Sequence, residues 1–208
     1  MKRLSFIASL ASAILISLSS CSGSGSGKSL LFGSLPSEYA EFREERGKLD
    51  EEAKNVTTEA EKEKIIKKGK KLEEKWTPKL EKAAKELDGK EIPFTDGVFK
   101  VTSPISLTFE KLASRSLEPI FKINGTVENA EPITVENTFN PSLLVYIAGY
   151  DADGNDLYHL KVGRITGEVK LNVLEIPAGT PVEFSTLTFD YSKIDQYPEA
   201  KTLKFIYI

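Results

Sequence analysis

The chain has 208 residues, with 28 basic and 31 acidic side chains, one histidine and one cysteine. Its formal net charge of −3 argues against a nucleic-acid-binding protein, which would need a basic face. A lone cysteine excludes an intrachain disulfide, so an exported domain of this chain has to obtain its stability from packing.

The first twenty residues are typical of a secretory signal peptide. Lys2 and Arg3 precede an apolar stretch from Leu4 to Leu18 that is interrupted only by small residues. This stretch is shorter than the roughly 20 apolar residues that a transmembrane helix needs. We therefore predict that residues 1–20 are a leader removed on export. The remaining chain would carry 26 basic and 31 acidic residues, a net charge near −5.

The leader ends at Leu18-Ser19-Ser20-Cys21, an aliphatic residue and two small residues directly before a cysteine. This motif resembles the lipobox of bacterial lipoproteins. The resemblance implies that Cys21 becomes the first residue of the mature protein and its lipid attachment site. Two or three acyl chains hold a protein on a bilayer effectively permanently. The alternative is an unmodified thiol in a leader that is simply removed.

Residues 21–34 begin as a low-complexity linker, with the sequence SGSGSGKS from Ser22 to Ser29. Such a composition predicts a flexible tether between a lipid and a folded domain. Ser22 is not the aspartate that retains many Gram-negative lipoproteins in the inner membrane, and the linker lacks the acidic cluster of surface-export signals. The resemblance thus implies a location on the periplasmic face of the outer membrane rather than on the cell surface.

Residues 35–89 are rich in Glu and Lys and have helical periodicity. Two apolar stripes follow each other along the chain. The first consists of Tyr39, Phe42, Leu49, Ala53 and Val56, and the second of Ile65, Leu72, Trp76, Leu80, Ala83, Ala84 and Leu87. Thr58 and Glu61 have the spacing of a capping box, which predicts the start of the second helix. We expect Pro78 to break or bend that helix at Trp76–Pro78, and a short helix to follow that ends at Asp88-Gly89.

The narrow apolar stripes indicate that this helical hairpin cannot fold alone. It has to pack on the region that follows, on itself or on a partner. A docking arm or coiled coil is one interpretation of its charge, and a solvated face with Glu–Lys pairs is the other. The heptad pattern is not sustained, which favours the solvated face.

Residues 90–208 are rich in β-branched and aromatic residues, with turn signals at short intervals. Seven to nine strands are predicted, over Ile92–Phe94, Val98–Thr102, Ile105–Leu112, Ile120–Glu128, Leu143–Tyr150, Asp156–Val162, Glu168–Ile176, Val182–Asp190 and Leu203–Ile208. This pattern favours an antiparallel immunoglobulin-like β-sandwich. The predicted fold class is therefore α+β and mainly β, with a charged helical hairpin before the sandwich.

A short segment, Leu87-Asp88-Gly89-Lys90-Glu91-Ile92-Pro93, is similar to a segment of some uncharacterised Bacteroides-type lipoproteins. In those proteins charged helices precede a β-sandwich. The resemblance covers seven residues and implies an architecture, without an activity.

The segment from Asp151 to Asp156 begins like a calcium-binding EF-hand loop, with Asp151, Asp153 and Asn155 at alternate positions. The match then fails, because Asp156 replaces the glycine at the sixth position and Val162 replaces the glutamate at the twelfth. Asp-Gly between two strands is also a strong hairpin signal. A plain turn is the favoured interpretation, and a weak calcium site is the alternative.

Aromatic residues near this turn could form a ligand platform. Tyr146, Tyr150 and Tyr158 lie close to it in sequence and could stack on a sugar, although packing between strands is the commoner role of such side chains. His159, the only histidine, has no partner set for zinc or nucleophilic catalysis and is expected to be a half-exposed strand residue.

No phosphate-binding loop, dinucleotide motif or nucleophile elbow is present in the sequence. We therefore predict a protein that is not an enzyme and needs no cofactor. The expected function is that of a lipid-anchored cell-envelope protein whose sandwich binds a protein, peptide or glycan. The alternatives are a structural accessory subunit of an envelope assembly and an enzyme that uses carboxylates not identifiable from the sequence.

Overall fold

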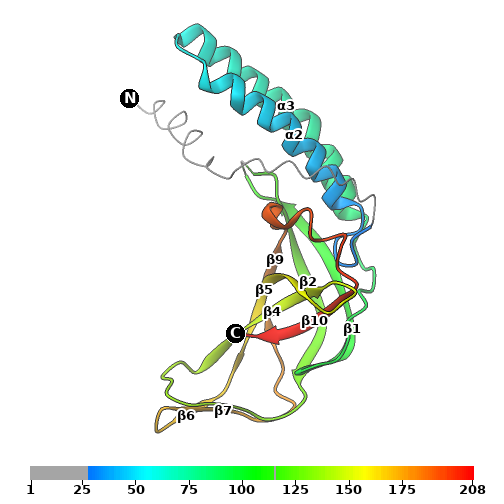
Figure 1. Cartoon of the computed structure of the whole chain (residues 1–208), viewed down its shortest axis with the longest axis vertical. Helices are drawn as coiled ribbons and strands as arrows, with labels where there is room; N and C mark the ends of the chain where they lie inside the picture. Colours follow the sequence, from blue (N-terminus) through cyan, green and yellow to red (C-terminus); the bar gives the residue numbers. More distant parts are fainter. Residues whose placement is uncertain (1–27, 115) are drawn as a thin grey trace.

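A computed structural model describes residues 28–114 and 116–208, so the leader and Cys21 lie outside the described residues. The described chain begins with two long helices, α2 (Leu35–Lys54) and α3 (Glu59–Lys85), which form an antiparallel hairpin. The hairpin projects from one end of a region built of strands (Figure 1). The predicted order of a helical segment followed by a β-rich region is thus confirmed.

The strands form three antiparallel sheets. Their orders are β1-β2-β9, β10-β4-β5-β8 and β3-β7-β6. The bounds are β1 Phe99–Leu112, β2 Pro119–Asn129, β3 Ile133–Val135, β4 Ser142–Tyr150, β5 Asp156–Thr166, β6 Glu168–Lys170, β7 Val173–Ile176, β8 Glu183–Phe184, β9 Thr186–Thr188 and β10 Thr202–Tyr207. A short 3-10 helix spans Tyr191–Lys193 before β10. The immunoglobulin-like arrangement of these sheets stays a prediction.

Several predicted strand boundaries are wrong. The two strands expected on either side of Pro104 form one strand, β1, because register shifts between Val101 and Ser106 accommodate the proline. The strand expected over Glu168–Ile176 is a hairpin, β6–β7. The strand expected over Val182–Asp190 is divided, and its halves β8 and β9 pair with β5 and β2 in different sheets. Ile92–Phe94 forms no strand, although the Ile92 amide donates to the Ile105 carbonyl at 2.8 Å.

The capping box at the start of α3 is confirmed, whereas the break at Trp76–Pro78 is wrong. The Thr58 hydroxyl accepts from the Glu61 amide at 3.3 Å, and the Glu61 carboxylate accepts from the Thr58 amide at 3.0 Å. Helix α3 then continues through Pro78 as one element. Trp76 and Leu80 on either side of the proline are fully buried, so packing holds the helix where the local sequence alone would interrupt it.

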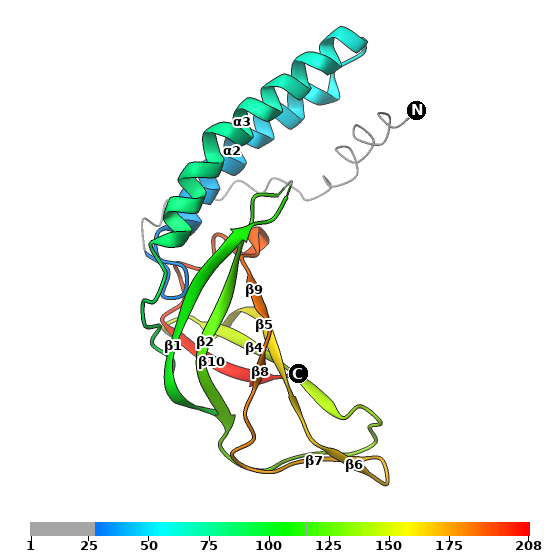
Figure 2. The ribbon, with the colours of Figure 1, turned by 180° about the vertical axis from the view of Figure 1, so that it is seen from behind.

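The base of the hairpin shares one core with the sheets. Phe32, in the turn that leads into α2, lies with its ring centroid 5.1 Å from Phe189, 5.8 Å from Phe121 and 4.8 Å from Tyr197. The Tyr39 hydroxyl of α2 donates to the Ser116 carbonyl in the β1–β2 connection. The hairpin therefore packs on the β-region through its base, and its outer half extends away from it (Figure 2).

Candidate functional site

The four-stranded sheet has one face in the core and one face turned outward. Strand β4 lies between β10 and β5, and its side chains alternate between the two faces. Val145 and Ile147 are fully buried with Leu203 and Phe205 of β10, so they mark the inner face. The opposite side of this sheet is termed the outer face below.

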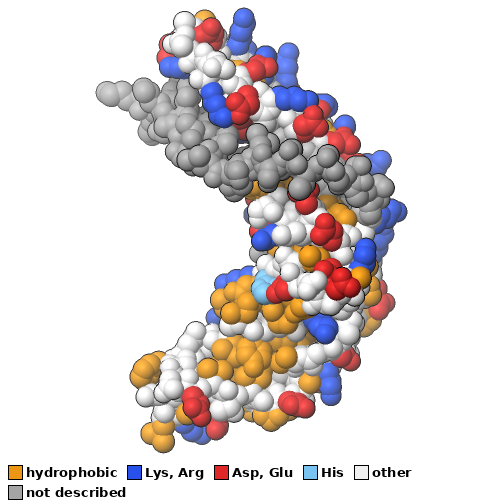
Figure 3. Space-filling view, in the orientation of Figure 1, with side chains coloured by type: hydrophobic (Ala, Val, Ile, Leu, Met, Phe, Trp, Pro, Cys, Tyr) orange, Lys and Arg blue, Asp and Glu red, His pale blue; other side chains and the backbone are white. Residues whose placement is uncertain are grey.

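The outer face is apolar along its middle strand. From β4 it receives Leu144, Tyr146, Ala148 and Tyr150, and Ile206 lies beside Tyr146 on β10. Ala148 is fully buried, whereas the other four side chains are half-buried and are not packed against the core cluster. Hydrophobic side chains gather over this sheet in Figure 3. The outward side of a solvated antiparallel sheet is normally polar, so this composition needs a reason other than folding.

Charged side chains flank the apolar row on both sides. On β10, the ammonium of Lys204 lies 5.6 Å from the centre of the Tyr150 ring. On β5, Lys161 is exposed opposite Tyr146, and Arg164 pairs with Glu183 of β8 at 2.8 Å. Lys161 and Lys204 have no ion-pair partner within residues 28–114 and 116–208. The face thus combines an apolar row with uncompensated positive charge.

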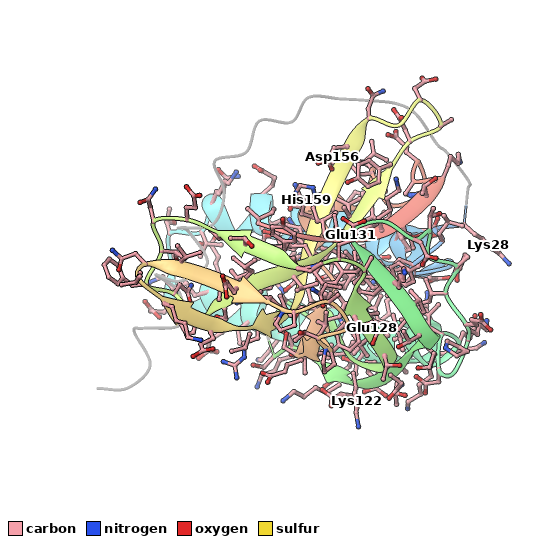
Figure 4. All side chains as sticks on the ribbon, turned by 90° about the horizontal axis from the view of Figure 1, so that it is seen from below. Lys28, Lys122, Glu128, Glu131, Asp156 and His159 are labelled. Carbon is pink, nitrogen blue, oxygen red and sulfur yellow. The ribbon has the colours of Figure 1, made fainter. Side chains whose placement is uncertain are left out.

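His159 occupies the same face and is half-exposed, as expected. Its ring centroid lies 6.3 Å from that of Tyr146, and its Nε2 atom lies 2.6 Å from an Asp156 carboxylate oxygen. Both residues come from β5 (Figure 4). The imidazole of His159 thus lies beside Tyr146 on the outer face and next to the Asp156 carboxylate.

The structure separates the three tyrosines that the sequence placed near the turn. Tyr146 and Tyr150 lie on the outer face, but Tyr158 is only 2% exposed and packs with its ring centroid 4.9 Å from Tyr197. Burial raises the pKa of the Tyr158 hydroxyl well above its ordinary range. Tyr158 therefore belongs to the core, and the platform consists of two tyrosines rather than three. The alternation along β5 contains this signal, because Tyr158 is in phase with Leu160.

The segment from Asp151 to Asp156 forms a turn in which the carboxylate oxygen atoms of Asp151 accept hydrogen bonds from the segment itself. The Asp151 carboxylate accepts from the Asp153 amide at 2.9 Å, from the Asn155 amide at 2.8 Å and from the Asn155 side chain at 2.9 Å. These bonds, the Asn155 side chain first, lower the pKa of Asp151. No group of three or more His, Cys, Asp or Glu residues that could hold a metal occurs in the described part of the chain. The geometry is that of a local turn.

A second apolar feature, not predicted from the sequence, lies at the end of the molecule opposite the hairpin. Phe139 is 80% exposed and Leu171 is 97% exposed. The loops that carry them are joined by a hydrogen bond from the Thr138 amide to the Asn172 carbonyl at 2.9 Å. Leu171 and Asn172 both have positive φ, +51° and +64°, which is costly for leucine. We term Phe139 and Leu171 the distal tip. Its strained, exposed leucine favours an interaction role.

Comparison of the chain with protein-family models, with curated protein sequences and with solved structures gives no match. Among the helices described, none is both long and apolar enough to cross a membrane.

Proposed function

We propose that the protein is a lipid-anchored cell-envelope protein that binds a protein or peptide partner and catalyses no reaction. The observation that carries this proposal is the apolar row of the outer face, Leu144, Tyr146 and Tyr150 on strand β4. A row of this kind on a solvated sheet is typical of an interaction site. The β-region would act as an immunoglobulin-like binding module.

The side chains of the outer face favour a polypeptide over other ligands. Leu144 and Ile206 are aliphatic and offer neither a stacking surface nor hydrogen bonds to a sugar, but they suit apolar side chains of a partner. Lys161 and Lys204 flank the row without ion-pair partners among the described residues, so an acidic rim on the partner would complement them. The distal tip would extend the same contact.

A glycan is the second candidate, supported by Tyr146 and Tyr150. They lie four residues apart on one strand and one face, about 13 Å along the strand, which suits stacking against two non-adjacent sugar units of one chain. This candidate requires both rings, whereas the polypeptide candidate also requires the aliphatic residues.

The anchor in this proposal is the lipid on Cys21, and the location is the outer membrane with the protein on its periplasmic face. The anchor derives from the lipobox resemblance of Leu18–Cys21, and the location derives from Ser22 and from the linker, which lacks an acidic cluster. Incorporation of labelled palmitate into the full chain, and its loss in the Cys21→Ser variant, test the anchor. Label that persists in the variant would refute it.

Site-specific crosslinking in intact cells tests the binding face. A photoreactive phenylalanine analogue at Tyr146 should capture a discrete protein, and a Leu144→Ser, Ile206→Ser double variant should lose that product. The same probe at Lys122 is the matched control, because Lys122 projects from β2 on the side of the molecule away from His159 (Figure 4). Equal capture at both positions would refute the assignment. Retention on a polysaccharide that is lost in Tyr146→Ala and Tyr150→Ala variants would favour the glycan.

A further inference from the structure

Helix α3 carries a continuous row of lysines along one face. The row consists of Lys64, Lys67, Lys71, Lys75, Lys82 and Lys85. At 3.6 residues per turn these positions fall within an arc of about 80°, and the row is about 32 Å long. Ala60 and Pro78 are the other α3 residues within this arc, so it contains no acidic residue. We term the six lysines the lysine stripe.

The stripe faces solvent and is only partly neutralised. All six lysines are exposed. Lys75 pairs with Glu45 of α2 at 2.5 Å, and Lys85 lies 3.6 Å from Glu81. The other four have no ion-pair partner in the described ranges, 28–114 and 116–208. Because the chain as a whole is acidic, this positive charge is a local feature of one edge. Basic side chains follow the convex edge of the hairpin in Figure 3.

The stripe and the outer face point in different directions. The side of α3 that carries Trp76 and Leu80 is buried in the core, so the lysines lie on the side turned away from it. Helix α3 and the β1–β2 hairpin are nearest the viewer in Figure 2, whereas the apolar side chains over β4, β5 and β10 face the viewer in the opposite view of Figure 3. A surface bound along the stripe would therefore leave the outer face free.

We propose that the lysine stripe binds the anionic phospholipid headgroups of the bilayer from which the chain is tethered; this inference rests on the proposed anchoring at Cys21. Six residues lie between Cys21 and Lys28, and the seven residue-to-residue steps, at about 3.4 Å each, span no more than about 24 Å. Lys28 lies at the margin of the molecule (Figure 4), and the chain runs from it through Phe32 into the base of the hairpin. The tether thus keeps the hairpin base, where Lys82 and Lys85 lie, close to the lipid surface.

The form of the stripe favours a bilayer over a nucleic acid. A straight row on one helix face presents its charges to a plane, as basic amphipathic segments do at anionic membranes. Nucleic-acid sites add aromatic or hydrogen-bonding side chains for the bases, whereas the stripe holds only lysines together with Ala60 and Pro78. Trp76, the only tryptophan, is buried on the other side of α3.

The test uses residues 22–208, which lack Cys21 and contain every core residue that the structure describes. Its probe is co-sedimentation with vesicles of phosphatidylcholine alone or mixed with phosphatidylglycerol. The protein should bind only the mixed vesicles, and roughly 0.5 M salt, where the Debye length is about 4 Å, should release it. Each lysine close to an anionic surface contributes about fivefold to binding. Lys64→Gln, Lys67→Gln, Lys71→Gln and Lys82→Gln together should therefore weaken binding at least 100-fold.

The matched control removes the same charge from the β-region. It combines Lys161→Gln and Lys204→Gln on the outer face, which points away from α3, with Lys170→Gln and Lys201→Gln, which lie outside β1 and β2. This control should bind nearly as the parent does, and circular dichroism should show that both quadruple variants are folded.

Three results would overturn the proposal. The first is equal binding to both kinds of vesicle, and the second is an equal loss in the two quadruple variants. The third is duplex DNA competing the protein off the vesicles through the same four lysines, which would reassign the stripe to nucleic acid. Because the tested chain has no Cys21, a failed palmitate experiment and a failed vesicle experiment remain distinguishable.

Discussion

Replacing Phe32 by alanine tests whether the hairpin and the sheets unfold as one unit. Phe32 is fully buried and contacts three aromatic rings of the β-region, Phe121, Phe189 and Tyr197. Truncating a buried phenylalanine costs about 3–5 kcal/mol, including the cavity that it leaves. With a urea m value of about 2 kcal/mol/M, the unfolding midpoint should fall by roughly 2 M.

Two optical probes make this measurement specific. Trp76 is the only tryptophan and lies at the hairpin base, so its fluorescence follows the helices, whereas near-UV circular dichroism of the tyrosines follows mainly the sheets. Both transitions should move together in Phe32→Ala. Phe139→Ala removes the same side chain from a site that is 80% exposed, and should change the free energy of unfolding by less than about 0.5 kcal/mol. A loss below about 1 kcal/mol in Phe32→Ala, or a tryptophan transition that separates from the tyrosine transition, would contradict the shared core.

Three further changes have defined expectations. Pro78→Ala should stabilise the protein by about 1–2 kcal/mol, because it restores a helical hydrogen bond in α3 at a smaller cost in unfolded-chain entropy, and calorimetry should show Tm about 2–8 °C higher. Leu171→Asn should stabilise by about 0.5–1 kcal/mol, because asparagine tolerates the positive φ of this turn; an unchanged Tm would argue against strain there. Burial raises the pKa of Tyr39, Tyr158 and Tyr197. These tyrosines ionise in the unfolded chain above pH about 10 but stay protonated in the folded protein. The free energy of unfolding is therefore retained below that pH and should fall above it by up to about 4 kcal/mol per pH unit for the three tyrosines together. Urea titrations at rising pH would measure this fall.

The helical hairpin could be predicted because its signals are local. The spacing of Tyr39 and Phe42 and the Thr58–Glu61 capping box need no partner to be recognised. The continuity of α3 through Pro78 could not be predicted, since it depends on the burial of Trp76 and Leu80 against other elements. Local propensity decides a helix only where tertiary packing does not override it.

The outer face of the four-stranded sheet likewise could not be predicted from local sequence. Strand β4 is apolar at nearly every position, from Leu143 to Tyr150, so its alternation defines two faces without identifying the buried one. The pairing of β4 with β10 places Val145 and Ile147 in the core and Tyr146 outside. The division of Val182–Asp190 between two sheets likewise arises from pairing partners far along the chain. By contrast, the spacing of the lysines in α3 can be recognised in the sequence. Only the structure shows that the helix face that carries them does not pack against the core.

If the stripe lies on the bilayer, the orientation of the whole protein is determined, and this can be measured. In residues 22–208, which contain no cysteine, one cysteine is introduced at Lys67→Cys on the stripe or at Tyr146→Cys on the outer face, and each variant is mixed with phosphatidylglycerol-containing vesicles. The cysteine at position 67 should lose reactivity towards a water-soluble thiol reagent when vesicles are added, because five stripe lysines remain to hold it at the headgroups. The cysteine at position 146 should keep its reactivity, because the outer face points away from α3. Protection at position 146 with free reaction at position 67 would mean that the apolar face, rather than the lysine stripe, meets the membrane.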